Sequence, residues 1–320
     1  MKRQIDILFA TYNGARTLPL MLDALSRLQA PERPWRIIAV NNRSDDQTAD
    51  LLAGWSARLP IEISEGPGTG KVPALTLAAR KLEGDLVVLT DDDILPEPGW
   101  LRALEAAADA HPETSIFGGA IQPVPIDELG PWYDASEDYA LDLFGRTRDV
   151  SGPVKGADVI FGPNMMMRRE AALAALTDPA PLGPSPAGRS GKRIFPLGDE
   201  SEMIARLEKA GVLSRFVPEA CVGHMVRAFQ TDLGFMLQRA QNHGRGVALR
   251  AIGPASNYPA RLRIAAGSAL RAGWIWPRAV LADRSRPDRE TFNTLYGLNW
   301  HAGRIKGALS GPFSSCKRPP

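Results

Sequence analysis

The chain has little cysteine: its 320 residues include only Cys221 and Cys316. Two cysteines give no disulfide framework and no metal-binding spacing, and they favour a reducing compartment. No apolar run approaches the roughly 18 residues of a membrane span, and the N-terminus runs directly into a charged and then strand-like segment, Met1–Ile5, which does not fit a secretory signal. These absences predict a cytoplasmic protein that is soluble or rests on the inner face of a membrane.

The chain also lacks a strong net charge, at +2, but its charges are distributed unevenly. Residues 251–320 contain eleven Lys and Arg residues and three acids, which leaves this tail at +8 and residues 1–250 at −6. A basic tail on an acidic body indicates contact with an anionic surface. No nucleic-acid-binding module is recognisable, so the sequence does not favour a nucleic acid as that surface.

The first hundred residues alternate between strand and helix patterns, which is typical of βαβ units in a parallel sheet. Apolar runs predict strands at 5–10, 36–40, 61–63 and 86–90. Apolar residues at helical spacing predict helices at 18–28, 46–55 and 72–82. The predicted fold class is therefore α/β, with a mostly parallel sheet flanked by helices.

The remainder of the chain gives mixed signals. Residues 118–152 have weak periodicity, 157–167 resemble a buried strand, and 177–193 are rich in Pro, Gly and Ser, which predicts a loop. Other patterns predict a helix at 201–210, strands near 216 and at 221–226, and helices at 231–246, 259–281 and 288–309.

Three consecutive acids, Asp91, Asp92 and Asp93, follow the strand predicted at 86–90. Ligands of open α/β sheets gather beyond the carboxyl ends of the strands. Acids crowded there repel one another, and an oxygen-rich cluster suits Mg²⁺ or Mn²⁺. The alternative is a solvated acidic turn that caps the helix beginning near Pro98, and the triplet alone does not decide between the two.

The segment Gly66–Val72 resembles part of a phosphate-binding P-loop. That motif requires a Gly where this chain has Glu65 and a Ser or Thr where it has Val72. The hydroxyl that would bind a metal is therefore missing, which excludes nucleotide hydrolysis of the P-loop kind. Lys71 remains able to reach a phosphate as a point charge.

Four segments together resemble the family 2 glycosyltransferases over residues 5–246. They are Phe9–Gly14 after the first strand, Asn41–Thr48 after the second, Asp91–Asp93 after the fourth, and Gly198–Glu202 at the start of a later helix. The resemblance implies a GT-A fold. It also implies inverting transfer of a sugar from a nucleotide-diphospho-sugar, with a divalent metal.

The resemblance also assigns donor contacts. It implies that Thr11, Tyr12 and Asn13 contact the base and ribose, and that Asp91 and Asp92 lie beside the nucleotide. It places Asp93 on the metal. The family usually carries an Asp in its second segment, where this chain has Asn41 and Asn42, whose amide oxygens accept hydrogen bonds without a charge. This departure leaves the nucleotide base open.

An inverting transfer needs a carboxylate that accepts the proton of the acceptor hydroxyl. The family usually shows Glu-Asp at this place, whereas this chain has Asp199-Glu200. Asp199 and Glu202 fit a capping box at the helix start, which leaves Glu200 to face the site. We therefore expect Glu200 to be the base, with Asp199 as the alternative.

Further positions have a role by resemblance and a structural alternative. His224 is either a metal or diphosphate contact or a hydrogen-bonded core residue. For two arginines the resemblance implies a contact with the diphosphate, and the alternative is a solvated helix face. For three other residues it implies a contact with the acceptor or the donor sugar, and the alternatives are turn chemistry or core packing. The diphosphate candidates are Arg239 and Arg245, and the acceptor or sugar candidates are Trp132, Asp158 and Asn164.

We predict a catalytic domain over residues 1–250, with a nucleotide half to about 115 and an acceptor half from 116, followed by a basic helical extension over 251–320. In the helix at 259–281, Arg263, Arg271 and Arg278 share one side near two tryptophans, which fits a surface-lying membrane anchor. Arg261 and Trp274 blur the separation of faces, so a helix packed on the catalytic domain is the alternative.

The resemblance implies a glycan or polyprenyl-linked acceptor in bacterial surface glycan synthesis. Two rivals are a nucleotidylyltransferase, which would show a Gly-rich basic loop after the first strand, and a non-catalytic homologue that binds sugar nucleotides, which would lack one of the acidic segments. Residues 10–14 form no such loop, and both acidic segments are present.

Overall fold

The computed structural model describes residues 2–134, 136, 144–177, 199–252, 258–284 and 287–310. Its contacts divide the chain into two compact units. The first contains the described parts of 1–124, 137–191 and 199–225, and the second contains those of 125–136 and 226–320. The division into functional domains at residue 250 stays a prediction.

A single mixed sheet forms the first unit. Among the described residues it has nine strands, in the order β3-β2-β1-β4-β8-β6-β9-β5, with β7 paired to β9. The strands are β1 Lys2–Thr11, β2 Trp35–Asn41, β3 Ile61–Glu65, β4 Gly84–Leu89, β5 Ile94–Pro96, β6 Ile116–Pro125, β7 Gly152–Val154, β8 Met165–Arg168 and β9 Ser214–Val226. Strands β3, β2, β1 and β4 are parallel, and β8 joins β4 antiparallel.

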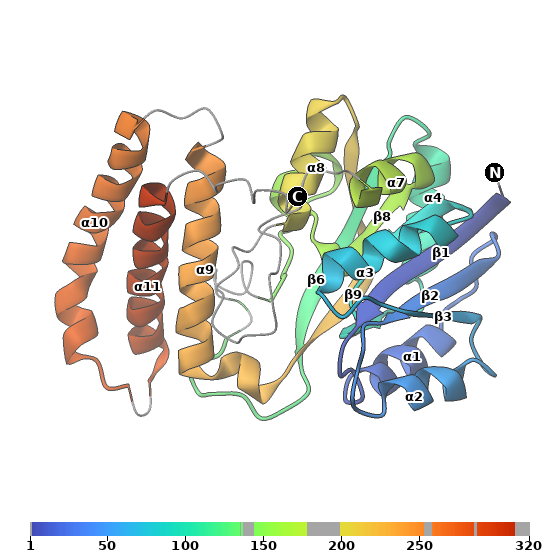
Figure 1. The fold of residues 1–320 in the computed structure, drawn as a ribbon, viewed down its shortest axis with the longest axis horizontal. Helices are drawn as coiled ribbons and strands as arrows, with labels where there is room; N and C mark the ends of the chain where they lie inside the picture. The colour runs from blue at the N-terminus through green and yellow to red at the C-terminus, as the bar shows by residue number, and fades with distance from the viewer. Residues whose placement is uncertain are drawn as a thin grey trace, which may run out of the picture. The chain divides into compact units, whose positions relative to one another are not determined.

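Helices cover both faces of the parallel strands, with α1 and α2 on one face and α3 and α7 on the other (Figure 1). The helices of this unit are α1 Leu18–Ser26, α2 Thr48–Trp55, α3 Lys71–Ala78, α4 Trp100–Ala110, α6 Gly156–Val159, α7 Arg169–Thr177 and α8 Asp199–Lys209. Short 3₁₀ turns occupy Ala79–Lys81 and Gly162–Asn164. Because both faces are covered, the apolar side chains of β1, β2 and β4 are almost all excluded from water, which explains their continuous apolar runs.

Three long helices make up most of the second unit: α9 Leu233–Ile252, α10 Tyr258–Leu281 and α11 Arg289–Leu309. They lie side by side, with α11 packed against both α9 and α10 (Figure 1). A 3₁₀ turn at Ala228–Thr231 precedes α9. None of the described helices has the length and apolarity needed to span a membrane.

The structure corrects two of the predicted elements. The strand predicted over 157–167 is in fact α6, a 3₁₀ turn and the short strand β8, since Gly162 and Pro163 interrupt the apolar run. The two strands predicted near 216 and 221–226 are one continuous strand, β9. Pro218 does not end it, because this residue lies between the segment paired with β7 and the segment paired with β5.

Two further segments had no predicted strand or helix. The strand β6 begins at Ile116 and extends into the segment 118–152, whose weak periodicity gave no strand prediction. Most of the loop predicted at 177–193 lies outside the described residues.

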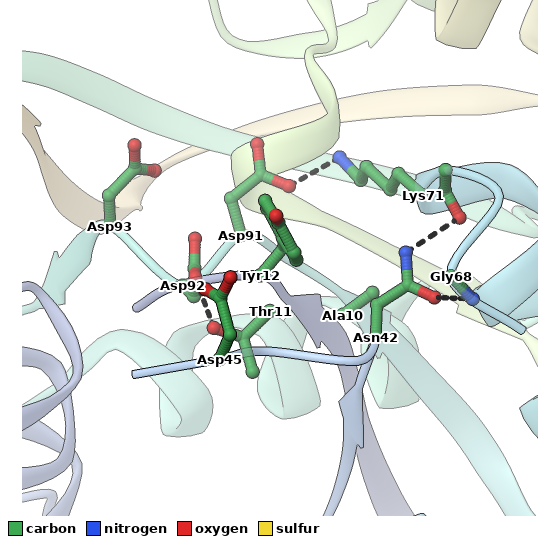
Figure 2. A pocket seen from close by; sticks show the side chains of 11 residues that line it. Ala10, Thr11, Tyr12, Asn42, Asp45, Gly68, Lys71, Asp91, Asp92 and Asp93 are labelled. Atoms are coloured by element: carbon green, nitrogen blue, oxygen red, sulfur yellow. Dashed lines mark hydrogen bonds and ion pairs between the residues drawn. The ribbon is translucent and has the colours of Figure 1, made fainter. Parts of the chain in front are cut away.

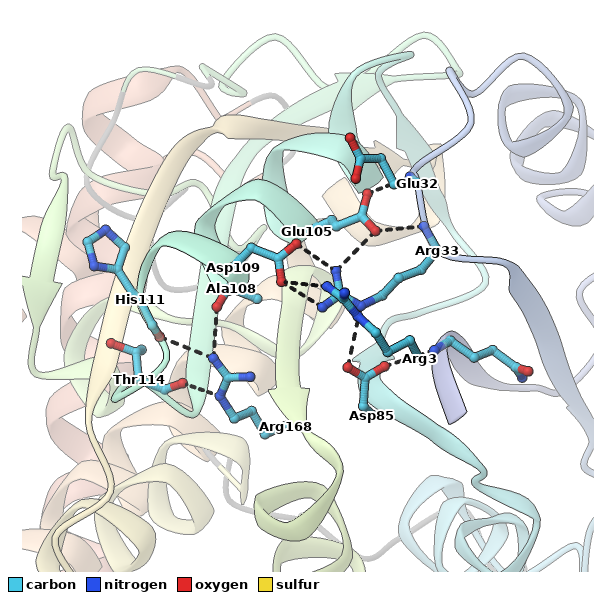
Figure 3. A network of polar contacts seen from close by, with 11 residues as sticks. Arg3, Glu32, Arg33, Asp85, Glu105, Ala108, Asp109, His111, Thr114 and Arg168 are labelled. Carbon is cyan, nitrogen blue, oxygen red and sulfur yellow. Dashed lines mark hydrogen bonds and ion pairs between the residues drawn. The ribbon is translucent and has the colours of Figure 1, made fainter. Parts of the chain in front are cut away.

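A buried ion-pair network joins α4 to the segment that enters β2 (Figure 3). The Arg33 side chain is 6% exposed and donates to Glu105 at 3.1 Å and to Asp109 at 2.6 Å. The Glu105 carboxylate also accepts the backbone N–H groups of Glu32 and Arg33 at 2.7 and 2.8 Å. Every charge in this network therefore has a partner, which is the condition for burying one.

Asn164 occupies the centre of the sheet's antiparallel half. It is fully buried, and its Oδ1 accepts from the Trp100 indole N–H at 2.8 Å. Its amide nitrogen donates to the carbonyl oxygens of Ala120 on β6 and Ala220 on β9, at 2.9 and 2.8 Å. Both amide hydrogens and the carbonyl oxygen are thus engaged within the core, which supports the core-packing alternative, and the sugar contact of Asn164 stays a prediction.

We expect Arg33→Met to lower the free energy of unfolding by about 3–5 kcal/mol, because it leaves Glu105 buried without its cation. Arg3→Met is the matched control, since Arg3 pairs with the same Asp109 at 3.5 Å but is 74% exposed, and it should cost about 1 kcal/mol or less.

The hydrogen bond from Arg33 holds the pKa of Asp109 below its ordinary value of 3.8. The Asp109 contribution is therefore present above about pH 4 and lost as the pH falls through the lower folded pKa. Urea unfolding across this range measures both effects, and equal losses in the two variants at pH 7 would contradict the account.

We expect Asn164→Ala to lower the free energy of unfolding by on the order of 3 kcal/mol or more, because three buried partner groups lose their hydrogen bonds. Thermal and urea unfolding measure this loss. A variant that unfolds like wild type and fails only in turnover would instead place Asn164 at a sugar.

Candidate active site

The register of the parallel strands brings four loops to one edge of the sheet. Thr11 pairs with Asn41, and Asn41 with Glu65, so that β1, β2 and β3 end level with one another. Leu8 pairs with Leu89, which brings the end of β4 to the same edge. The loops that follow these strands therefore converge where open α/β sheets bind their ligands.

These loops surround a cavity of about 710 Å³, large enough for a nucleotide-sized ligand (Figure 2). Among the residues that the structure describes, four carboxylates line it, those of Asp45, Asp91, Asp92 and Asp93, together with one ammonium group, that of Lys71. The other lining residues are Ala10, Thr11, Tyr12, Asn42, Gly68 and Gly70. The lining is thus strongly acidic.

The loop after β1 is fixed by hydrogen bonds to its neighbours. The buried Thr11 hydroxyl donates to Asp92 Oδ2 at 2.5 Å, which ties the ends of β1 and β4 together. Asn13 has a left-handed backbone with φ 54°, which Asn tolerates better than most residues. Its side chain exchanges two hydrogen bonds with Asp45, at 2.7 and 3.0 Å. Tyr12 remains 56% exposed at the pocket and presents its ring to a ligand.

The two asparagines at the end of β2, Asn41 and Asn42, form hydrogen bonds with backbone groups of the neighbouring loops. Asn42 accepts from the Gly68 N–H at 2.8 Å and donates to the Gly70 carbonyl at 3.2 Å (Figure 2). Asn41 accepts from the Ser44 N–H at 3.1 Å. The two Asn42 bonds hold the loop at 66–70 that leads into α3, where Gly68 has φ +74°. Of the two asparagines, only Asn42 lines the cavity.

Lys71 begins α3 and reaches across the pocket to two carboxylates. Its ammonium contacts Asp91 Oδ1 and lies 3.5 Å from Glu200 Oε1. Burial lowers the pKa of Lys71, but the charges of Asp91 and Glu200 outweigh it and raise the pKa above its ordinary value. Lys71 is therefore charged and holds two acids that would otherwise repel each other.

Asp93 and His224 form a second pair. Asp93 precedes β5, whose first residue pairs with His224 on β9, and the His224 Nε2 atom lies 3.4 Å from Asp93 Oδ1. The His224 Nδ1 atom is 2.7 Å from the Phe144 carbonyl oxygen, which only accepts hydrogen bonds, so Nδ1 carries a hydrogen. Burial lowers the pKa of His224, but the Asp93 carboxylate outweighs it and raises that pKa. Asp93 and His224 thus place a carboxylate oxygen and a ring nitrogen side by side, which is a donor set for a single cation.

This pair fits a divalent cation whose other ligands come from a phosphate group. A metal-binding histidine usually donates its second ring N–H to a carbonyl or carboxylate, as His224 does to Phe144. Among the described residues no cluster of three or more His, Cys, Asp and Glu side chains forms a metal site. Magnesium-type sites often have only one or two protein ligands and complete their shell with phosphate oxygens and water.

Glu200 lies in the first turn of α8, where the helix dipole favours a negative charge. Its carboxylate rests against Gly162, since a Cβ at that glycine would lie 2.7 Å from Glu200 Oε1. Glu200 therefore has one neighbour that restricts it sterically and one, Lys71, that attracts it. Asp199 starts the same helix, and its side chain lies outside the described residues.

Several predicted residues do not line the pocket. Trp132 is 2% exposed and stacks on Phe292 at 3.7 Å, in the second unit. Asp158 lies exposed on α6. Arg239 and Arg245 belong to α9 of the second unit, and their diphosphate role stays a prediction.

Asp45 is a pocket residue that the sequence analysis did not select. It lies just before α2, where its neighbour Asp46 accepts the Thr48 N–H at 3.0 Å. Its position in the segment after β2, which reaches the same edge of the sheet as the acid triplet, is the sequence feature from which a pocket role could have been predicted.

Comparison with known proteins supports the geometric interpretation. The profile of Glycosyl transferase family 2 matches residues 6–173, more than half of the chain. Over 114 residues, or 34% of this chain, the sequence is 23% identical to poly(ribitol-phosphate) beta-N-acetylglucosaminyltransferase TarS of Staphylococcus aureus. Over the same share it is 25% identical to undecaprenyl-phosphate 4-deoxy-4-formamido-L-arabinose transferase of Pectobacterium carotovorum. These matches span 19% and 35% of the two relatives.

The fold is also found in solved structures. The mannosyltransferase PcManGT from Pyrobaculum calidifontis, solved with GDP-Man and Mn²⁺, superposes with a TM-score of 0.57 at 20% identity, over 96% of this chain and 87% of that one. The predicted α/β fold class is thereby confirmed as that of the GT-A glycosyltransferases. The chain belongs to glycosyl transferase family 2 and is a glycosyltransferase.

Proposed function

We propose that the chain transfers a sugar from a nucleotide-diphospho-sugar to a hydroxyl acceptor, with inversion and with a divalent cation. The observation that carries this proposal is the charge of the pocket. A diphosphate is an anion, and a cavity lined by four carboxylates and one ammonium group repels it. A divalent cation at Asp93 and His224 reverses this repulsion locally.

The pocket residues divide the work of holding the donor. Tyr12 offers a ring for stacking on the base, and Asp45 offers the carboxylate that the asparagines after β2 lack. Lys71 approaches the diphosphate as a point charge. Asp93 and His224 would hold Mn²⁺ or Mg²⁺, with the imidazole favouring Mn²⁺ of these two. A bound cation neutralises charge on the leaving diphosphate as a Lewis acid.

Glu200 is the general base in this proposal. Its carboxylate takes the proton of the acceptor hydroxyl while that oxygen bonds to the anomeric carbon on the face opposite the donor phosphate. The bond from the anomeric carbon to the phosphate oxygen breaks, and the nucleoside diphosphate leaves with the electron pair. Lys71 and Gly162 hold Glu200 in place for this step.

We propose a glycan or a polyprenyl-linked acceptor. The names of the two relatives, a poly(ribitol-phosphate) transferase and an undecaprenyl-phosphate transferase, support this class. Family membership decides against the nucleotidylyltransferase alternative. The non-catalytic alternative predicts donor binding without turnover.

A thermal-shift panel of UDP-, GDP- and dTDP-sugars tests donor and metal together. With Mn²⁺ and a donor at a hundredfold excess over its Kd, we expect one nucleotide to raise the unfolding midpoint by on the order of 5 °C. EDTA should abolish most of this shift, and Asp93→Asn should reduce it. Asp50→Asn, an exposed acid on α2 outside the pocket, should not. An undiminished shift in EDTA would refute the metal dependence.

Turnover by variants of Glu200 and of its neighbour Gly162 tests the assignment of the general base. We expect Glu200→Gln to lower kcat by about 10²–10⁴-fold with donor binding retained, because the proton acceptor is lost. Gly162→Ala should lower kcat by roughly 10–100-fold by displacing Glu200, whereas Gly54→Ala, with no neighbour within 4 Å, should not. If Glu200→Gln keeps full activity and Asp199→Asn loses it, Asp199 is the base.

A further inference from the structure

Helix α10 presents large apolar side chains to water. Of the fourteen large apolar side chains that are exposed in the described part of the chain, seven lie on this helix. Leu270 is 78% exposed, Trp274 73% and Leu281 87%. Such a concentration on one element marks an interaction surface.

The buried side of α10 has the opposite composition. Its buried residues are the small Ala265, Ser268 and Ala279, and the helix packs there against α11. A helix normally buries its large apolar residues and exposes its polar ones. In α10 the fully buried residues are small, the large Ile264 and Ile275 are partly buried, and the other large apolar residues are exposed, so the outer face is suited to apolar surroundings.

Helical spacing gathers the large residues into one stripe. Leu270, Trp274 and Leu281 follow one another at intervals of four and seven residues, which puts them on one face of the helix, on the side opposite Ala265 and Ser268. Arg261, which blurred the two faces in the sequence, donates to the Ser310 carbonyl at 2.6 Å at the end of α11. It therefore does not interrupt the outer face.

Positive charge flanks this stripe. Arg263, Arg271 and Arg278 are exposed, and the 24 residues of α10 include no acid. The Arg278 guanidinium lies 4.9 Å from the centre of the Trp274 ring. Burial and, after it, the nearby charge of Arg271 lower the pKa of Arg304 on α11, so Arg271 has a second cation near it.

This combination identifies the occupant. Leucines and tryptophans with flanking arginines are what a helix lying in a bilayer interface requires, since Trp and Arg place apolar stems among acyl chains and polar ends among headgroups. A second copy of the chain is a poorer fit, because a shared α10 face would bring like charges together. An anionic lipid surface complements both features.

We propose that the outer face of α10 (Leu270, Trp274 and Leu281, with Arg263 in line with them and Arg271 and Arg278 beside them) binds the surface of anionic phospholipid bilayers. The helix lies in the plane of the interface, with its apolar stripe toward the acyl chains and its arginines at the phosphates. The binding uses no residue of the donor pocket, so it stands apart from the proposed transfer chemistry.

Vesicle co-sedimentation of the full chain, without donor or metal, tests this proposal. At 50 mM NaCl we expect binding to vesicles of equal phosphatidylglycerol and phosphatidylcholine, and at least tenfold weaker binding to phosphatidylcholine alone or at 500 mM NaCl. Leu270→Ser/Trp274→Ser should weaken binding at least tenfold, and each of Arg271→Gln and Arg278→Gln about fivefold. The control Leu20→Ser/Leu213→Ser changes two exposed leucines of the first unit and should bind like wild type.

Equal unfolding midpoints show that the variants are folded, and sedimentation velocity gives their oligomeric state. A wild-type chain that does not co-sediment with anionic vesicles at 50 mM NaCl would overturn the proposal. So would a dimer that the α10 variants dissociate, since the face would then be buried between copies. Loss of nucleotide response in the thermal-shift panel would leave vesicle binding untouched, which separates this proposal from that of the active site.

Discussion

Carboxylates crowded at one edge of a sheet are the constraint on which the site depends. Asp91, Asp92 and Asp93 follow β4, Asp45 follows β2, and Glu200 approaches from α8. Such a group is stable only with cations among it. The protein supplies the ammonium group of Lys71 between Asp91 and Glu200, and it places the His224 imidazole beside Asp93. In the proposed function, Asp93 and His224 would hold a divalent cation, which would add a second positive charge to this arrangement.

The rest of the first unit holds these groups in register. The level ends of β1, β2 and β3 put the loops at one edge, and the Thr11–Asp92 hydrogen bond joins the first loop to the acids. Elsewhere in this unit, Arg33 ties α4 to the segment before β2, and Asn164 joins β6 to β9. Polar groups buried in this way are costly unless fully paired, so they specify one arrangement of the elements.

The sequence allowed the parallel half of the sheet to be predicted, because β1, β2 and β4 are continuous apolar runs between amphipathic helices. It also allowed the acid triplet and Lys71 to be predicted as pocket residues. The long strand β9 was predicted as two, because Pro218 reads locally as a break and only its pairing partners show otherwise. Asn and Trp occur both in ligand sites and in protein cores. Whether Asn164 and Trp132 contact a ligand or pack in the core depends on partners that lie 44 or more residues away in the sequence. The outward stripe on α10 required knowledge of which face meets α11.

The central claim is that Asp93 and His224 hold the cation that makes an acidic pocket accept a diphosphate. Anomalous diffraction at the manganese edge, from crystals grown with Mn²⁺ and the nucleoside diphosphate that gives the largest thermal shift, tests it most directly. The account predicts one strong peak within bonding distance of the Asp93 carboxylate, His224 Nε2 and the diphosphate oxygens. A diphosphate bound in this pocket by side chains alone, with no manganese at Asp93, would contradict it.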